Sequence, residues 1–181
     1  MRAFVSMRKL IASRHGLLQR MDGLERKHLE TEQKIEKVFK ALEQNIIPSQ
    51  GVFFDGQVFD AYELTSRIIR SAKKSIVLID NYIDESTFTH LSKKQNGVKA
   101  TILSKSNSKQ LQLDLKKANE QFGNFQLIPF NKSHDRFLII DQKEVYHVGA
   151  SLKDLGKKLF ALSKLDAQLA EPILKLAQNE K

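Results

Sequence analysis

The sequence contains no cysteine, which excludes disulfide bonds and thiolate metal sites. Its five histidines are too scattered for a zinc cluster, so we expect neither a metal nor a cofactor. No run of residues is apolar enough to span a membrane, and the N-terminus lacks the hydrophobic core of a signal peptide. These features predict a cytoplasmic protein that does not enter a membrane.

Acidic residues are in deficit, because 21 Asp and Glu oppose 30 Lys and Arg and leave a formal charge of +9. Polyanions are the natural partners of such a chain, and their binding is expected to weaken steeply with salt. A basic surface without a nucleic-acid function is the alternative. A length of 181 residues, 41% of them hydrophobic, allows one ordinary domain plus an extension.

The first 45 residues are predicted to form one long helix, since residues 4–44 lack proline. An apolar heptad seam runs along it through Met7, Leu10, Leu17, Met21, Leu24, Ile35, Val38 and Leu42, with polar interruptions at Arg14, His28 and Thr31. A helix of about 60 Å needs a partner to be stable in a small protein. We therefore expect a parallel coiled coil and a homodimer; a helix folded back onto its own domain is the alternative.

Residues 46–51, which include Pro48 and Gly51, form the predicted linker. The predicted elements beyond it are a hairpin at 52–59 around Asp55-Gly56, a helix from Asp60 to Ala72, strands at 75–79, 98–103 and 125–130, helices at 85–94 and 108–121, a hairpin at 136–148, an amphipathic helix at 152–165 and a frayed C-terminal helix in 166–181. This alternation predicts an α/β domain over 52–165, and the antiparallel hairpin at 136–148 makes its sheet a mixed one flanked by helices.

One stretch sets a potential nucleophile beside a fixed cation. It reads Ser133-His134-Asp135-Arg136-Phe137-Leu138-Ile139-Ile140-Asp141, with Gly149-Ala150-Ser151 shortly after. Because strand side chains alternate between faces, His134 and Arg136 are predicted to share one face while Asp135 points away. The apolar run that follows indicates a strand buried on both sides. The polar pair is thus expected at the mouth of a buried sheet; an ordinary surface pair is the alternative.

A tight turn at residues 142–143 is predicted to join this strand to a second one at 144–148. In that register Arg136 lies opposite Gly149, and His134 lies opposite Ser151. The glycine would leave room beside the arginine and the serine would add a hydroxyl, which together describe a phosphate cradle.

Three further residues take positions relative to this cradle. Lys153 would begin a helix whose N-terminus favours an anion, although a solvated lysine face is an equal alternative. Asp141 lies at the far end of the strand, about 20 Å from His134, and is expected to be structural. His147 falls on the cradle's face and is interpreted as a satisfied core histidine.

Polar residues Asp80, Asn81 and Tyr82 follow the buried strand at 75–79 and are candidates for the rim of the site. Asp80 is expected to orient His134 through its second ring nitrogen. For Asn81 a helix-initiating turn is the favoured alternative.

The spacing of His134, Arg136 and Asp141 resembles the His-x-Lys-x4-Asp (HKD) motif of the phospholipase D family, and residues 149–151 resemble its Gly-Ser-x-Asn. The resemblance implies a phospholipase D-like fold and metal-free phosphodiester cleavage through a phosphohistidine. His134 would be the nucleophile or general acid, Arg136 the phosphate clamp and Ser151 an auxiliary donor. Two departures are an arginine in place of the lysine, and Leu152 or Lys153 in place of the asparagine.

A second resemblance lies at the N-terminus. Met1-Arg2-Ala3-Phe4-Val5-Ser6-Met7-Arg8 is similar to the tail of the phage antirepressor N-terminal domain family, which is related to KilA-N. It implies that the chain is a fragment or internal-start product of a longer phage-related regulator.

These features together predict a metal-independent nuclease that acts on DNA or RNA. Its chemistry needs two histidines, one to attack and one to protonate the leaving oxygen, whereas the chain carries one motif. The site is therefore expected to be shared by two chains. The alternatives are a domain that binds nucleic acid without cutting it, and an oligomerisation or regulatory module.

Overall fold

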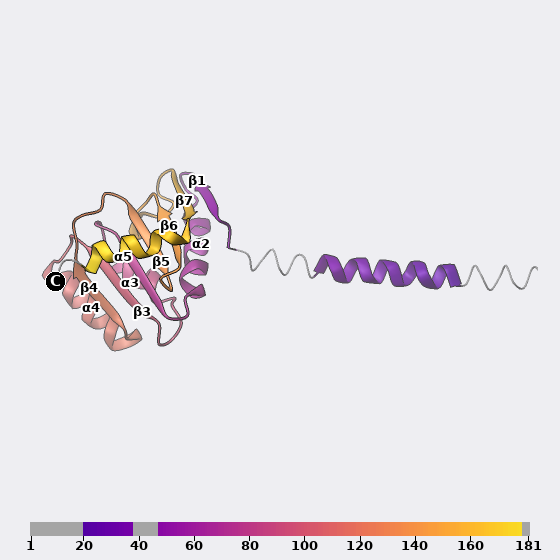
Figure 1. The fold of residues 1–181 in the computed structure, drawn as a ribbon, viewed down its shortest axis with the longest axis horizontal. Helices are drawn as coiled ribbons and strands as arrows, with labels where there is room; N and C mark the ends of the chain where they lie inside the picture. The colour runs from indigo at the N-terminus through magenta and orange to yellow at the C-terminus, as the bar shows by residue number, and fades with distance from the viewer. Residues whose placement is uncertain (1–19, 38–46, 179–181) are drawn as a thin grey trace, which may run out of the picture. The chain divides into compact units, whose positions relative to one another are not determined.

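The computed structural model describes residues 20–37 and 47–178 (Figure 1). The chain divides into two compact units, Met1–Ile46 and Ile47–Lys181.

Residues 20–37 of the first unit form a helix, and every residue in it is exposed. Its apolar side chains include Met21, Leu24 and Ile35, which belong to the predicted seam and are 50%, 66% and 49% exposed. The rest of the predicted helix lies outside the described residues. The coiled coil and the homodimer stay predictions.

The second unit is built, over its described residues, on a seven-stranded mixed sheet with the order β1-β7-β6-β5-β2-β3-β4. The strands are β1 (Gln50–Phe53), β2 (Ser75–Ile79), β3 (Lys99–Ser104), β4 (Phe125–Pro129), β5 (Arg136–Ile140), β6 (Glu144–Val148) and β7 (Phe160–Leu165). Strands β2, β3 and β4 are parallel, and the remaining pairs are antiparallel. The predicted mixed α/β architecture is confirmed.

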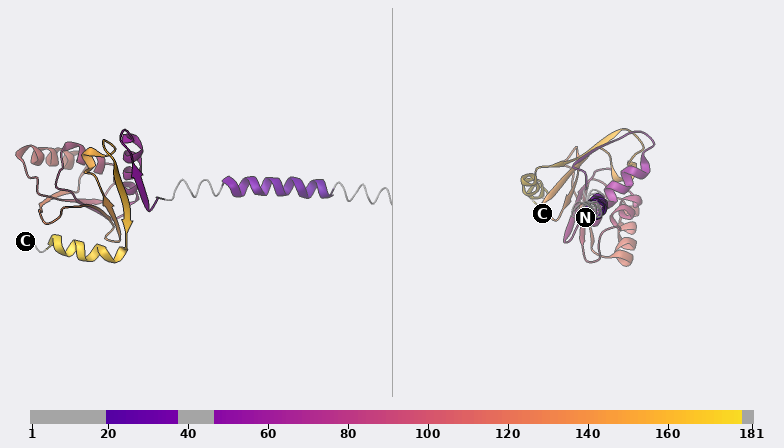
Figure 2. Two further views of the ribbon diagram at one scale, coloured as in Figure 1. Left: turned by 90° about the horizontal axis from the view of Figure 1, so that it is seen from above. Right: turned by 90° about the vertical axis from the view of Figure 1, so that its right-hand side faces the viewer.

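Helices cover both faces of this sheet (Figure 2). Helices α2 (Val58–Ser71), α3 (Glu85–Leu91) and α4 (Lys109–Phe122) cover one face, and α5 (Ala170–Gln178), which follows the short 3-10 turn Ala167–Leu169, covers the other. Local capping defines where two of them begin: Asp84 and Thr87 form a capping box at α3, and Ser108 accepts a hydrogen bond from Leu111 N at α4.

The motif strand β5 is buried on both sides, as predicted. Leu138 packs with α2, α3 and α4 in the larger core, whereas the next residue, Ile139, packs with α5. Both side chains are fully buried. The structure has the C-terminal helix that the sequence predicts. It is not frayed at its start, because Ala170 is only 1% exposed and contributes to a core layer.

The predicted hairpin at 52–59 was also wrong. Strand β1 pairs with β7 instead, with Val52 opposite Ala161, and it begins at Gln50, inside the expected linker. Phe53 stacks on Phe160 with ring centroids 5.0 Å apart, so long-range aromatic packing stabilises this pairing. After the Asp55-Gly56 turn the chain enters α2 at Val58, which places Asp60 in the first turn and not at its N-cap.

The predicted amphipathic helix at 152–165 is a 3-10 turn, Leu152–Asp154, followed by strand β7. Burial in the first half of β7 alternates between successive residues, which is the period of a strand. Gly156 separates the two elements with a φ of +70°, and a Cβ there would lie 2.4 Å from Val58 Cα. Only glycine allows this segment to lie so close to the start of α2.

Candidate functional site

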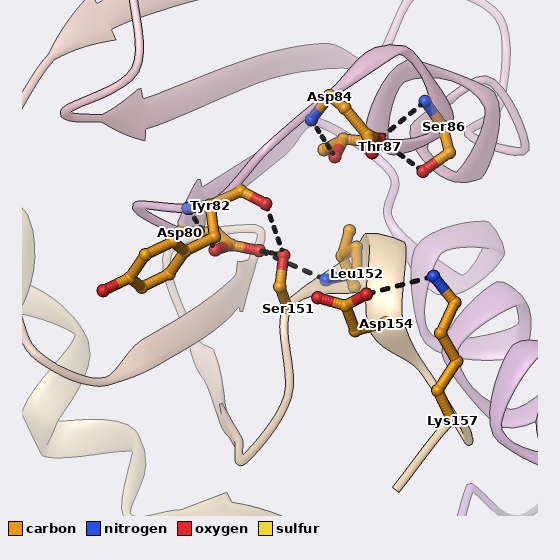
Figure 3. Close-up of polar contacts among 9 residues, drawn as sticks. All are labelled: Asp80, Tyr82, Asp84, Ser86, Thr87, Ser151, Leu152, Asp154 and Lys157. Carbon is orange, nitrogen blue, oxygen red and sulfur yellow. Dashed lines mark hydrogen bonds and ion pairs between the residues drawn. The ribbon is translucent and has the colours of Figure 1, made fainter.

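A basic cavity of about 510 Å³ opens at the edge of the sheet where β5 begins, β6 ends and β7 begins. Its lining includes four basic side chains and one acidic one: Arg136, Lys153, Lys157, Lys158 and Asp154. Lys157 Nζ lies 3.0 Å from Asp154 Oδ1 (Figure 3), so one of the four cations is already paired. The remaining excess of positive charge suits an anionic ligand.

Arg136 is the cation that comes from the sheet itself. Its guanidinium carbon lies 5.4 Å from the ring centroid of Tyr82, within range of a cation–π interaction. Its Nε is buried and has no hydrogen-bond partner among the described residues. A buried donor without an acceptor costs about 1–3 kcal/mol, and an acceptor placed at this atom would offset that cost.

The predicted strand register was wrong by one residue, because Arg136 lies opposite Val148 and not Gly149. The connecting loop has three residues, 141–143, and Lys143 N donates to Ile140 O across it at 3.0 Å. A slip of one residue moves side chains to the other face. His147 accordingly lies opposite Phe137, on the face away from Arg136.

His147 lies near Asp135: Nε2 of the histidine is 3.6 Å from Oδ1 of the aspartate, so the two side chains form an ion pair when the histidine is protonated. His147 is half-buried and its ring lies 5.8 Å from that of Phe137. It therefore takes no part in the cavity beside Arg136.

Gly149 lines the cavity but does not open space beside the arginine. Its N donates to Ala161 O at 2.9 Å, and a Cβ on this residue would lie 2.9 Å from the same oxygen. The glycine is required because the backbone approaches β7 closely.

Ser151 is 3% exposed and does not face His134. Its Oγ lies 2.7 Å from Asp80 Oδ2 and 2.8 Å from Tyr82 O (Figure 3). Lys153, two residues on, lines the cavity from the short 3-10 turn and not from the start of a long helix. The predicted anion site at a helix N-terminus is therefore absent at this position.

Asp80 is fully buried and holds the cavity wall together. Besides Ser151, its carboxylate accepts hydrogen bonds from Tyr82 N at 3.0 Å and Leu152 N at 3.1 Å (Figure 3). These bonds join the end of β2 to the segment after β6. The expectation that Asp80 orients His134 was wrong, because its oxygens are directed at these other groups.

Asn81 joins three segments at the same sheet edge. Its Nδ2 donates to Ser133 O at 2.6 Å, and its Oδ1 accepts from Lys105 N at 3.1 Å. Ser106 Oγ donates to its backbone oxygen at 3.0 Å. The side chain thus fixes the backbone of the residue that precedes His134, a connection that no local sequence pattern indicated.

His134 is exposed and does not line the cavity. Within the described part of the chain its ring makes no hydrogen bond and no ion pair. It lies two residues before Arg136 at the same edge of the sheet. The structure thus brings Arg136, Ser151 and Lys153 together at one cavity and leaves His134 outside it.

Asp141 lies at the opposite end of β5. Its carboxylate accepts hydrogen bonds from the backbone N–H groups of Lys73, Lys74 and Ser75 at 2.9, 2.7 and 2.9 Å. Burial alone would raise the pKa of this carboxyl, but the three N–H groups, together with the charge of Lys74, outweigh it and hold the pKa below its ordinary value. Asp141 thereby fastens the β5–β6 turn to the start of β2.

No group of three His, Asp or Glu side chains within the described residues could hold a metal ion. Every helix of that part of the chain is too short or too polar to cross a membrane.

Solved structures show which known fold this architecture resembles. No protein-family model and no curated protein matches the sequence. NucT from Helicobacter pylori superposes with a TM-score of 0.53 at 16% identity, over 72% of this chain and 93% of NucT. The fold is phospholipase D-like.

Two other solved structures are more distant. TrmBL2, an archaeal chromatin protein, gives a TM-score of 0.45 at 19% identity, over 87% of this chain and 63% of TrmBL2. Polyphosphate kinase from Porphyromonas gingivalis gives 0.43 at 14% identity, over 78% of this chain and 24% of the kinase.

Proposed function

We propose that this phospholipase D-like protein cleaves phosphodiester bonds in nucleic acid without a metal, using His134 in a site that two chains share. The observation that carries the proposal is Arg136, an arginine with an unpaired Nε among the described residues, at a basic cavity on the sheet edge. A phosphate is the ligand that this geometry fits best. DNA and RNA both supply it.

Arg136 would hold two oxygens of the scissile phosphate, since its planar guanidinium suits bidentate contacts. Lys153 and Lys158 would attract the neighbouring phosphates along the strand. The positive charge of the whole chain, +9, would add to this attraction.

His134 would act as the nucleophile. A neutral ring nitrogen attacks phosphorus, the bond to one sugar oxygen breaks, and that oxygen takes a proton from a second histidine. Water then attacks the phosphorus of the phosphohistidine and gives a proton to the second histidine, while the bond between phosphorus and the ring nitrogen breaks and the phosphate monoester leaves. The second histidine would be His134 of another copy of the chain, and the exposed position of this ring leaves it accessible to such a copy.

Binding without cleavage is the second candidate, favoured by the position of His134 outside the cavity lining. Arginine in place of the motif lysine, and Leu152 or Lys153 where the motif has asparagine, also favour binding without cleavage. A regulatory module that associates through the exposed apolar side chains of helix 20–37 is the third.

Cleavage of labelled single and double strands in excess EDTA tests the proposal. We expect turnover that His134→Ala and Arg136→Ala abolish, while Arg136→Lys retains activity because it restores the residue of the motif. His147→Gln is the matched control, since this histidine lies on the other face of the sheet. Strict dependence on added magnesium or manganese would contradict the mechanism, and binding with no turnover would favour the second candidate.

A further inference from the structure

A second cavity, of about 410 Å³, lies beside the basic one and is lined largely by apolar and aromatic side chains. Three rings follow one another along it: Phe59, Tyr62 and His90. The centroids of Phe59 and Tyr62 are 6.4 Å apart, and those of Tyr62 and His90 are 5.3 Å apart. This volume is within the range of small-ligand sites.

Phe59 is 73% exposed although it is the most apolar of the three. It lies in the first turn of α2, and Val58 beside it is 47% exposed and also lines the cavity. An exposed aromatic side chain next to a cavity contributes little to the stability of the fold. It does provide a flat apolar surface to a ligand.

The two cavities are neighbours on one surface, because Lys153 and Lys157 line both. The residues between them are fixed in place: Ser151 lines the basic cavity, Leu152 lines the aromatic one, and Asp80 bonds to both. A ligand with an anionic part and a planar apolar part, joined by a short link, matches this pair of cavities.

His90 carries the third ring of the aromatic wall. Burial lowers the pKa of its ring, Asp84 raises it and Lys93 lowers it, with a net fall that keeps the ring neutral at pH 7. Its Nδ1 is buried and lacks a hydrogen-bond partner in the part of the chain that the structure describes. A neutral imidazole offers both a stacking surface and a hydrogen-bonding edge.

We propose that the aromatic cavity binds an unpaired nucleobase of the strand whose phosphate lies at Arg136. The inference rests on the proposed function, and it specifies the substrate as a single-stranded segment. A base of a duplex is already stacked and paired, so its faces are not available to Phe59 and Tyr62. An unpaired base offers a π face, as in other aromatic platforms for single strands.

The test compares two probes in the full chain: a short labelled all-thymidine DNA strand, and an abasic strand of equal length and charge. The His134→Ala background keeps both probes intact, and salt is held fixed. Phe59→Ala should weaken binding of the thymidine strand by about 5- to 150-fold and leave the abasic strand unchanged. Phe59→Tyr should retain binding.

Phe122→Ala is the matched control, because Phe122 is also an exposed aromatic on a helix and lines neither cavity. It should bind both probes like its parent. Equal binding of the thymidine strand by Phe59→Ala and its parent overturns the inference. An equal loss on both probes also overturns it, since Phe59 would then act on the strand's backbone or on the fold.

Arg136→Ala separates this inference from the proposed function. This substitution should weaken binding of both probes, because both strands carry the phosphate. If Arg136→Ala weakens binding of both probes while Phe59→Ala weakens binding of neither probe, the phosphate site stands and the base pocket is refuted. If Phe59→Ala acts only on the thymidine strand while Arg136→Ala has no effect, the base pocket stands and the phosphate site is refuted.

Discussion

Replacement of Asp141 should reveal how the β5–β6 turn is fastened to β2. The carboxylate accepts hydrogen bonds from three backbone N–H groups. Two of these groups belong to the exposed residues Lys73 and Lys74, where water can replace the lost hydrogen bond. The half-buried N–H of Ser75 is the costly one to leave without its charged acceptor. At about 1.5–3 kcal/mol for a hydrogen bond to a charged group, Asp141→Asn should lower the free energy of unfolding by about 1–2 kcal/mol, because its amide oxygen still accepts one bond.

Asp141→Ala should cost more, because Asp141 has a φ of 52°. Asparagine tolerates this left-handed conformation, whereas alanine adds about 1–2 kcal/mol of backbone strain. The two substitutions together separate the loss of the hydrogen bonds from the strain. Gln142→Asn is the control, since Gln142 has a φ of 59° and carries no carboxylate, and its unfolding free energy should stay within about 0.5 kcal/mol of wild type.

The effect of pH follows from the lowered pKa of Asp141. A carboxyl whose pKa falls on folding contributes stability that is present above its unfolded value of 3.8 and is lost as the pH falls through the folded pKa. Urea unfolding followed by far-UV circular dichroism from pH 7 to pH 3 should show a constant gap between wild type and Asp141→Asn, then a narrowing gap below about pH 3.8. A gap that does not change with pH, or one below about 0.5 kcal/mol at pH 7, would refute the reasoning.

Two further predictions concern the cavity wall and the N-terminal helix. Asp80→Ala should lower the free energy of unfolding, measured in urea titrations, by about 2–6 kcal/mol, because Tyr82 N and Leu152 N both lose the buried carboxylate that accepts their hydrogen bonds. A loss under about 1 kcal/mol would contradict the role given to Asp80. Glutamate at Leu17, Leu24 and Ile35 together should dissociate the chain in sedimentation and reduce cleavage in parallel, whereas full activity in a monomer would contradict a shared site.

Local patterns were sufficient to predict much of the sheet. Strands β2 and β5 are continuous apolar runs, which indicate burial on both faces, and Ser108 marks the start of α4 as an N-cap. Pairings between distant segments were missed. Strand β1 pairs with β7 through Phe53 and Phe160, and no local pattern records that contact.

At the candidate site, too, features set by the local sequence could be predicted and contacts between distant segments could not. Arg136 could be assigned to the sheet edge from the period of the strand, but the register across the turn depended on two residues, Asp141 and Gln142, that adopt a positive φ without being glycine. Aspartate is enriched in that conformation but glutamine is not, so at most a weak sequence signal marks one of the two positions. The partner of Ser151 is Asp80, 71 residues away, so its direction could not be read from its own surroundings.

Mixing of wild-type and His134→Ala chains tests the central claim most directly. The two proteins are co-refolded in equal amounts, at fixed total concentration, and cleavage of a single strand is measured in EDTA. A site that needs His134 from both chains predicts about one quarter of the wild-type rate, because only dimers of two wild-type chains are active. About one half of the wild-type rate would mean that each chain cuts alone, and it would contradict the shared-site account.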